Sequence, residues 1–271
     1  MIILDKPIAV GRTAEVYAWD EGQILKLYRD WCPPGWVDFE ARIGRVVQDA
    51  GLPVPAVGDM VEINGRRGLV YERLEGVSMF NTLIARPWTI VRFGRLTAEL
   101  HAAMHASPSP FDLPDQRARL KGAIERAQSL PDDLRRKTLA VLETCPDGDR
   151  LCHGDFHPDN VLMTQRGPVI IDWMTATRGD PLGDVARTVL LMTVGEPPTG
   201  VLIRLLTRLM RGSRSVRTAY LKRYFESRPE GRERLGKWLG VTYAARLAED
   251  IKGETKQLIA FVKRETQFHA P

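Results

Sequence analysis

Two carboxylates and one amide in the middle of the chain have the types and the spacing that phosphoryl transfer needs. Asp155 and Asn160 lie five residues apart in one loop, and Asp172 follows a predicted β-hairpin with its turn at residues 165–168. Phosphoryl transfer requires a carboxylate near the accepting hydroxyl and oxygen ligands that hold Mg²⁺ on the nucleotide phosphates. Asp155 is therefore the candidate catalytic base, and Asn160 and Asp172 are the candidate metal ligands.

Three longer strings surround these residues. They are H-G-D-F-H-P-D-N-V-L from His153, I-I-D-W ending at Trp173, and G-D-P-L-G-D-V-A from Gly179. Together they resemble the aminoglycoside phosphotransferase family, which shares the protein-kinase-like fold with choline, homoserine and fructosamine kinases. Protein kinases also place the Asn of their catalytic loop five residues after the Asp, and a metal-binding Asp after a short hairpin.

The resemblance implies an α+β, bilobal, protein-kinase-like fold. Residues 1–76 would form a nucleotide-binding lobe ending in the hinge, with a five-stranded antiparallel sheet and one helix. Residues 77–271 would form a larger, mainly helical lobe with the catalytic loop and the acceptor site. The sequence itself shows short strand patterns before residue 72. After Asp172 it shows helical patterns at residues 181–193, 199–209, 216–227, 231–250 and 254–268.

The first seventy residues carry candidate groups for a nucleotide site. Lys26 lies in an apolar strand, where a buried cation needs an anionic partner, and Glu40 in the next helical run is the natural one. Such a Lys–Glu ion pair positions nucleotide phosphates in kinases. Gly11 and Thr13 lie where the resemblance places the phosphate-covering loop, although one glycine replaces the full G-x-G-x-x-G. An ordinary β-turn at Gly11 and a solvated edge-strand lysine are the alternatives.

The same resemblance places a hinge after the strand that ends near residue 72. It implies that Tyr71 flanks the base pocket, and that backbone groups of Glu72 and Leu74 face the adenine. A plain strand end with charged residues is the alternative. ATP or GTP, together with Mg²⁺, is the implied cofactor.

The catalytic loop also needs supporting residues. The resemblance implies that His153 packs beneath the loop, that Asp184 braces it, and that Asp180 caps the helix beginning at Pro181. For His157 the sequence leaves contact with substrate or phosphate open.

His101 and His105 have the i, i+4 spacing of a metal-binding pair. Because no third ligand accompanies them on the predicted helix, we expect structural histidines rather than metal ligands.

Positive charge is concentrated near the C-terminus. Residues 201–271 hold 16 Lys and Arg against 7 Asp and Glu, whereas the rest of the chain holds 23 against 27. By resemblance the acceptor binds against helices of the larger lobe, where a basic wall would repel a polycationic aminoglycoside. A small hydroxylated acceptor that is neutral or anionic is therefore favoured. The alternatives are that these residues decorate solvated helix faces, and that the chain is an authentic aminoglycoside or other antibiotic kinase.

Other function classes fit the sequence less well. A nucleotide-binding pseudokinase or scaffold commonly lacks Lys26, Asp155 or Asp172, and all three are present. Only residues 173–178 separate Asp172 from Gly179, which leaves no activation segment as a platform for a peptide. The sequence therefore indicates a kinase of small molecules.

The net charge of +5 is not accompanied by a recognised nucleic-acid-binding motif. No apolar run of about eighteen residues appears, so we expect no membrane span. The three cysteines lack metal-site spacing, so we expect a cytoplasmic protein with reduced thiols. The sequence does not indicate an oligomeric state.

Overall fold

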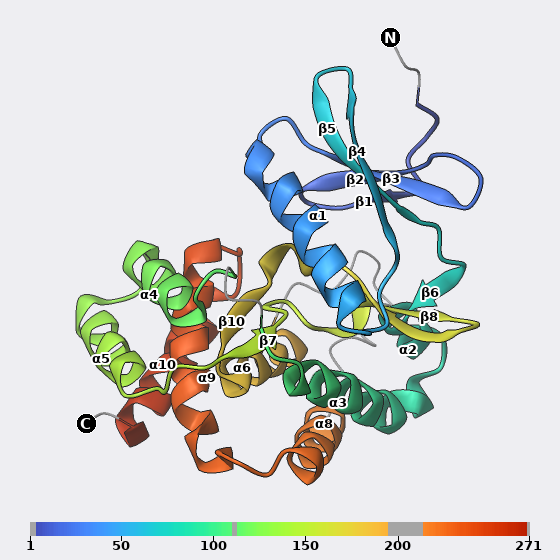
Figure 1. The fold of residues 1–271 in the computed structure, drawn as a ribbon. Helices are drawn as coiled ribbons and strands as arrows, with labels where there is room; N and C mark the ends of the chain where they lie inside the picture. The colour runs from blue at the N-terminus through green and yellow to red at the C-terminus, as the bar shows by residue number, and fades with distance from the viewer. Residues whose placement is uncertain (1–3, 110–112, 195–213, 270–271) are drawn as a thin grey trace. The chain divides into compact units, whose positions relative to one another are not determined.

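A computed structural model describes residues 4–109, 113–194 and 214–269 of the 271-residue chain. The chain forms two compact units (Figure 1). The first is drawn from residues 1–79 and 159–174, and the second from residues 80–158 and 175–271. The first unit is therefore discontinuous in sequence, because the hairpin that precedes Asp172 belongs to it.

The first unit is built on an antiparallel sheet of five strands in the order β1-β2-β3-β5-β4. Its strands are β1 (Ala9–Val10), β2 (Ala14–Ala18), β3 (Gln23–Tyr28), β4 (Val57–Ile63) and β5 (Arg66–Glu72). β4 and β5 are joined by Asn64 and Gly65, whose φ angles of 51° and 82° are those of a tight hairpin turn. The five strands and one helix expected before residue 72 are present in the described part of the chain.

That helix is α1 (Pro34–Asp49), which begins with proline at its first turn and packs against β4 and β5 (Figure 1). Its buried stripe recurs at helical spacing and includes Val37, Ala41 and Val47. Side chains alternate along a strand, so Leu25 and Leu27 pack on the sheet face opposite to that of Tyr28, which joins the core beneath α1.

A second, three-stranded sheet completes the first unit, in the order β6-β8-β9. Its strands are β6 (Gly76–Ser78), β8 (Val161–Thr164) and β9 (Gly167–Ile170). The expected hairpin before Asp172 is thus confirmed, but the turn predicted at residues 165–168 was too long. Pro168 pairs with Met163 inside the ladder, which proline tolerates here because β9 is an edge strand.

The second unit is mainly helical. Its helices are α2 (Met79–Ala85), α3 (Ile90–Ala106), α4 (Gln116–Arg126), α5 (Asp132–Glu143), α6 (Pro181–Thr193), α8 (Arg214–Ser227), α9 (Leu235–Arg246) and α10 (Thr255–His269). Helices α4, α5, α6 and α10 pack around α9, whose Trp238 and Val241 are fully buried (Figure 1). Strand β7 (Arg150–Cys152) pairs antiparallel with β10 (Thr177–Gly179).

Four of the five helical patterns expected after Asp172 coincide with described helices. The pattern at residues 231–250 is shorter as an α-helix than predicted, because 3₁₀ turns at Arg232–Arg234 and Leu247–Glu249 flank α9. The pattern at residues 199–209 lies outside the described residues. No helix in the described ranges is both long and apolar enough to cross a membrane.

Candidate active site

Lys26 lies at the centre of the polar cluster in the first unit. It projects from β3 and places its Nζ 2.7 Å from Glu40 Oε1 and 2.9 Å from Asp172 Oδ1. Glu40 is 2% exposed because it lies on the buried stripe of α1. The hydroxyls of Tyr28 and Tyr71 also donate to the Glu40 carboxylate. The carboxylate is therefore held from three directions, and it fixes where the ammonium group lies.

The charge state of Lys26 follows from these partners. Burial by itself would lower the pKa of the ammonium group, but the negative charges of Glu40 and Asp172 outweigh burial and raise the pKa above its usual value. Lys26 therefore stays protonated at neutral pH. Burial and the neighbouring Glu40 raise the pKa of Tyr71 well above its usual range, so its hydroxyl stays a neutral donor.

Asn160 and Asp172 are brought together by the backbone of the hairpin. The amide of Ile171 donates to the carbonyl oxygen of Asn160 at 3.0 Å, so the residue before Asp172 is bonded to Asn160. Asp172 has a φ of 66°, which non-glycine residues seldom adopt outside functional or turn positions. Its side chain is 40% exposed while contacting Lys26. A carboxylate and an amide oxygen are hard donors of the kind that Mg²⁺ prefers, so these residues fit that ion.

The other residues predicted for the nucleotide site make contacts that do not test their predicted roles. The amide of Gly11 donates to the carbonyl of Ala14 at 2.8 Å, which closes a tight connection between β1 and β2 around Thr13. The Glu72 carboxylate accepts hydrogen bonds from Arg166, at 2.8 Å and 2.9 Å, and Leu74 lies between β5 and β6. The phosphate-covering role of Gly11 and Thr13 stays a prediction. So do the adenine contacts of Glu72 and Leu74 and the base-flanking role of Tyr71.

Asp155 lies in the second unit, in the loop that follows β7. Its Oδ1 is 3.1 Å from Arg187 Nη2, and its Oδ2 is 3.7 Å from His157 Nε2. Arg187 also binds Glu249, with Nη1 2.7 Å from Oε1. Burial would raise the pKa of Asp155, but the neighbouring His157 ring and the positive charge of Arg187 outweigh burial and lower the pKa well below its usual range. Asp155 is therefore ionised at any pH near neutrality.

Side chains of helix α6 hold this loop in place. Asp184 accepts from the amides of His153 at 2.6 Å and Gly154 at 2.8 Å. One turn further on, Arg187 contacts the Asp155 side chain, and Thr188 donates to the carbonyl of Phe156 at 2.8 Å. Residues three and four positions apart share a helix face, so one face of α6 fixes four consecutive loop residues.

The roles expected for Asp184 and Asp180 can be compared with these contacts. Asp184 bonds the loop backbone as a brace would. Asp180 caps α6, as predicted, by accepting from the amide of Leu182 at 2.8 Å. Arg187 and Thr188 were missed by sequence reasoning, although their spacing from Asp184 on a predicted helix was a usable signal.

Gly154 is required by close packing. Its φ is 79°, and a Cβ at this position would lie 2.4 Å from the carbonyl oxygen of Thr175. The Thr175 hydroxyl in turn donates to the carbonyl of His153 at 2.8 Å. The amide of Asp155 donates to His153 Nδ1 at 3.3 Å. His153 is fully buried, so its ring lies inside the loop that carries Asp155.

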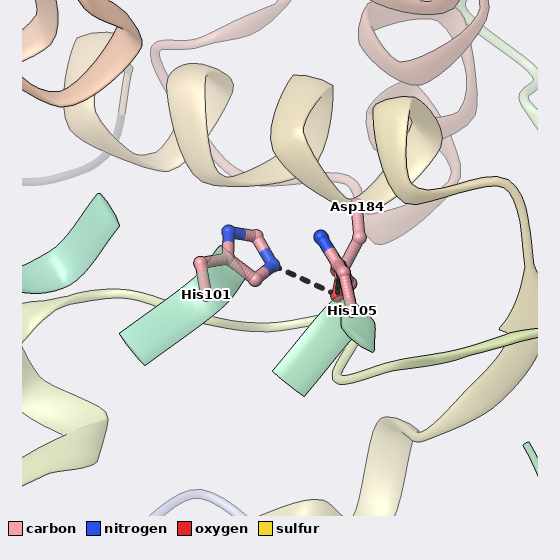
Figure 2. A group of neighbouring side chains, drawn as sticks. All are labelled: His101, His105 and Asp184. Carbon is pink, nitrogen blue, oxygen red and sulfur yellow. Dashed lines mark hydrogen bonds and ion pairs between the residues drawn. The ribbon is translucent and has the colours of Figure 1, made fainter. Parts of the chain in front are cut away.

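Two histidines from α3 converge on the Asp184 carboxylate, as Figure 2 shows. The Nε2 atoms of His101 and His105 lie 3.1 Å and 3.3 Å from Asp184 Oδ2. Their Nδ1 atoms lie 2.7 Å from the hydroxyls of Tyr220 and Tyr224, respectively. Both histidines are fully buried.

This arrangement bears on whether the two histidines form a metal site. No third ligand was predicted from the sequence. In the structure a carboxylate oxygen of Asp184 lies within 4.8 Å of a ring nitrogen of each histidine. Each ring nitrogen already has a hydrogen-bond partner, as buried polar atoms require. The geometry supports the structural interpretation, in which two Tyr–His pairs hold the carboxylate that braces the loop.

The network predicts a pH-dependent stability. Burial and the adjacent His101 lower the pKa of His105 to about 3. An unfolded histidine has a pKa near 6.5, so between pH 6.5 and about 3 the unfolded chain binds more protons than the folded one. The free energy of unfolding should therefore fall as pH decreases through this window, by up to about 1.4 kcal/mol per pH unit.

Urea denaturation at pH 7, 6 and 5 measures this effect. His105→Gln should give a less stable protein with a shallower dependence on pH, since the titrating ring is gone. Equal slopes for the variant and the wild type would contradict the assignment to His105.

Among the residues that the structure describes, the arginines beside Asp155 do not come from the basic C-terminal region. Arg187 precedes residue 200, and so does Arg119, whose pKa responds to the charges of Arg187 and Asp155. Several C-terminal cations have carboxylate partners instead. Examples are Arg223 with Glu99 at 2.8 Å, Arg246 with Glu254 at 2.9 Å and Arg264 with Glu265 at 2.7 Å.

Comparisons with known proteins agree with the fold. The family model described as the phosphotransferase enzyme family matches residues 6–238. None of the curated proteins compared with this chain matches it. Among solved structures, a thermostable mutant of aminoglycoside phosphotransferase APH(4)-Ia in its apo form is 19% identical, with a TM-score of 0.64 over 97% of this chain and 93% of the other.

Two further solved structures are similar. A choline/ethanolamine kinase family protein from Mesorhizobium loti is 18% identical, with a TM-score of 0.61 over 98% of this chain and 87% of the other. Amicoumacin kinase hAmiN is 15% identical, with a TM-score of 0.61 over 97% of this chain and 88% of the other. These likenesses confirm the expected α+β, protein-kinase-like fold class.

Proposed function

Because this chain belongs to the phosphotransferase enzyme family, we propose that it moves the γ-phosphoryl group of ATP, or of GTP, to a hydroxyl group of a small molecule. The observation that carries the proposal is the double contact of Lys26 with Glu40 and Asp172. A lysine held in this way is a typical partner of nucleotide phosphates. AMP-PNP in the structures of APH(4)-Ia with hygromycin B and of amicoumacin kinase supports nucleotide use.

The nucleotide site would draw on the first unit. Asn160 and Asp172 would hold Mg²⁺, which when bound neutralises charge on the phosphate oxygens. Lys26 would bind the phosphates, oriented by Glu40. Gly11 and Thr13 would cover the phosphates, and Tyr71, Glu72 and Leu74 would contact the base.

Acceptor chemistry would draw on the second unit. Asp155 would orient the acceptor hydroxyl and take its proton while the hydroxyl oxygen bonds to the γ-phosphorus. The bond from that phosphorus to the β-phosphate oxygen breaks, and the nucleoside diphosphate leaves. An ordinary ionised carboxylate suffices if the proton is lost late in a loose transition state. Arg187 and His157 keep Asp155 ionised, and α6 keeps it in place.

A neutral or anionic acceptor fits the surroundings of Asp155 better than a polycation. Arg187 and Arg119 both lie on this side of the second unit, and like charges opposed across a site cost affinity. An antibiotic acceptor is the second candidate. It is favoured by the hygromycin B and amicoumacin bound in the two similar structures.

A nucleotide-release screen of the purified protein against hydroxyl-bearing metabolites and antibiotics tests the proposal. Release of ADP that depends on one acceptor would identify the substrate class. Binding of Mg²⁺-ATP without turnover on any compound would favour a scaffold. Failure to bind Mg²⁺-ATP would contradict the proposal.

Replacing Asp172 with alanine should weaken Mg²⁺-ATP binding by about tenfold or more, which is about 1.4 kcal/mol. The change removes both a metal ligand and one of the two carboxylates that hold Lys26. Isothermal titration calorimetry measures the dissociation constant. Asp59→Ala, an exposed carboxylate in β4, is the matched control and should bind as the wild type does. Unchanged binding by Asp172→Ala would remove Asp172 from the nucleotide site.

A further inference from the structure

Among the described residues, Arg119 differs from the other charged residues near Asp155 in having no carboxylate partner. It lies on α4, its side chain is exposed, and its Nη1 donates to the carbonyl oxygen of Thr175 at 2.7 Å. In the part of the chain that the structure describes, this is the hydrogen bond that the guanidinium makes, and no carboxylate lies within ion-pair distance of it. A guanidinium has five N–H donors, so most of those of Arg119 are left for a ligand.

Arg119 is anchored beside the loop that carries Asp155. The Thr175 carbonyl that it binds packs against Gly154, where a Cβ would lie only 2.4 Å away. The Thr175 hydroxyl donates to the carbonyl of His153. Arg119 therefore docks on backbone that touches the two residues preceding Asp155.

The electrostatic interactions of Arg119 agree with this placement. Partial desolvation of the guanidinium by neighbouring protein atoms and the positive charge of Arg187 lower its pKa, whereas the negative charges of Asp155 and Glu249 act in the opposite direction. Arg119 is thus close enough to Asp155, Arg187 and Glu249 to interact with each of them.

The carboxylates around Asp155 are already paired with arginines. Asp155 binds Arg187, and Arg187 also binds Glu249 at 2.7 Å. Glu249 is shared with Arg246, which also binds Glu254 at 2.9 Å. A cationic acceptor would find each of these carboxylates engaged. Within the described residues, an anionic acceptor would find the exposed guanidinium of Arg119, which has no carboxylate partner there.

We propose that Arg119 is the anion-binding residue of the acceptor site, and that the acceptor is a hydroxylated compound bearing a carboxylate or a phosphate group. The planar guanidinium binds either group through two parallel hydrogen bonds. The anionic group pairs with Arg119 while a hydroxyl of the same molecule lies on Asp155. This inference rests on the proposed function, because it takes Asp155 as the residue that receives the hydroxyl.

Calorimetric titration of the full chain saturated with ADP and Mg²⁺ tests the proposal, since the nucleotide then occupies the phosphate-binding groups. The ligands are gluconate, glucose and glucosamine, which share one carbon skeleton and differ in charge, and glycerol 3-phosphate in parallel. Gluconate or glycerol 3-phosphate should bind more tightly than glucose, and glucosamine least tightly. The comparison of the two anions shows whether the site prefers a carboxylate or a phosphate.

Arg119→Gln should weaken binding of the preferred anion at least tenfold, which is about 1.4 kcal/mol, and leave glucose binding unchanged. The glutamine amide can still donate to Thr175, so the loop anchor is kept. Arg119→Lys should restore part of the affinity, because it restores the charge. Arg126→Gln is the matched control, since Arg126 is another exposed arginine on α4, and it should bind as the wild type does.

The possible failures are distinguishable. A chain that does not bind ADP with Mg²⁺ would contradict the proposed function itself. A chain that binds the nucleotide but neither anion, or whose Arg119→Gln variant binds the anion as tightly as the wild type, would overturn the anion site. Tighter binding of glucosamine than of gluconate would overturn it as well.

Discussion

Replacing Asp155 with alanine should reduce turnover by about 10²- to 10⁴-fold on whichever acceptor the chain uses, because a positioned general base contributes about that much. Binding of Mg²⁺-ATP should change little. Asp155 contacts Arg187 and His157 in the second unit, whereas Lys26 and Asp172 meet in the first. Steady-state ADP release gives kcat, and calorimetry gives the nucleotide affinity.

Two variants sharpen this experiment. Asp155→Asn keeps the shape and one oxygen but cannot hold a negative charge, so it should be nearly as impaired as the alanine variant. Asp149→Ala removes a solvent-exposed carboxylate just before β7 and should retain full turnover. Near-normal turnover by Asp155→Ala would show that another group handles the hydroxyl proton.

The largest expected effect on stability is that of Asp184→Ala. Asp184 is 1% exposed, and its carboxylate is bonded by the amides of His153 and Gly154 and by the rings of His101 and His105. Removing it leaves four buried groups without their common partner. Breaking a buried charged network by deleting one member costs about 3–5 kcal/mol. That is a large fraction of a typical domain's stability of about 5–15 kcal/mol.

Urea denaturation at pH 7 measures the loss. If Asp184→Ala does not accumulate as folded protein, Asp184→Asn provides a milder test, because it keeps one acceptor oxygen for the loop amides. The surface variant Asp149→Ala should lie within about 0.5 kcal/mol of the wild type. A loss below about 1 kcal/mol in Asp184→Ala would mean that the network contributes little to holding the loop.

Features that are local in sequence were predictable. The hairpin before Asp172 joins strands that adjoin in the chain, so apolar runs around a turn sufficed to place it. The turn was predicted too long because proline is typical of turns, whereas Pro168 lies in an edge strand, which accommodates it. The partner of Lys26 was predictable because a cation in an apolar strand needs a nearby anion, and Glu40 lies on the next helix.

Contacts between distant segments were not predictable. Asp155 and Arg187 are 32 positions apart, and His101 and Tyr220 are 119 apart. Residue types alone do not show which helix face meets which loop. The sequence therefore pointed to a surplus of positive charge after residue 200, while the described arginines beside Asp155 lie on α4 and α6. The roles assigned to the nucleotide and acceptor residues stay predictions until the variants are measured.

The discontinuity of the first unit has a consequence for synthesis on the ribosome. Residues 1–79 emerge first, but β8, β9 and Asp172 come from residues 159–174. At typical rates of about 5–20 residues per second, synthesis of residues 80–174 takes roughly 5 to 20 s after residue 79 has been added. During that interval β6 has no neighbouring strand, and the Lys26–Glu40 pair lacks its second carboxylate. In a truncated chain ending at residue 79, β6 would have no partner strand at any time. We expect chaperones to bind such a chain.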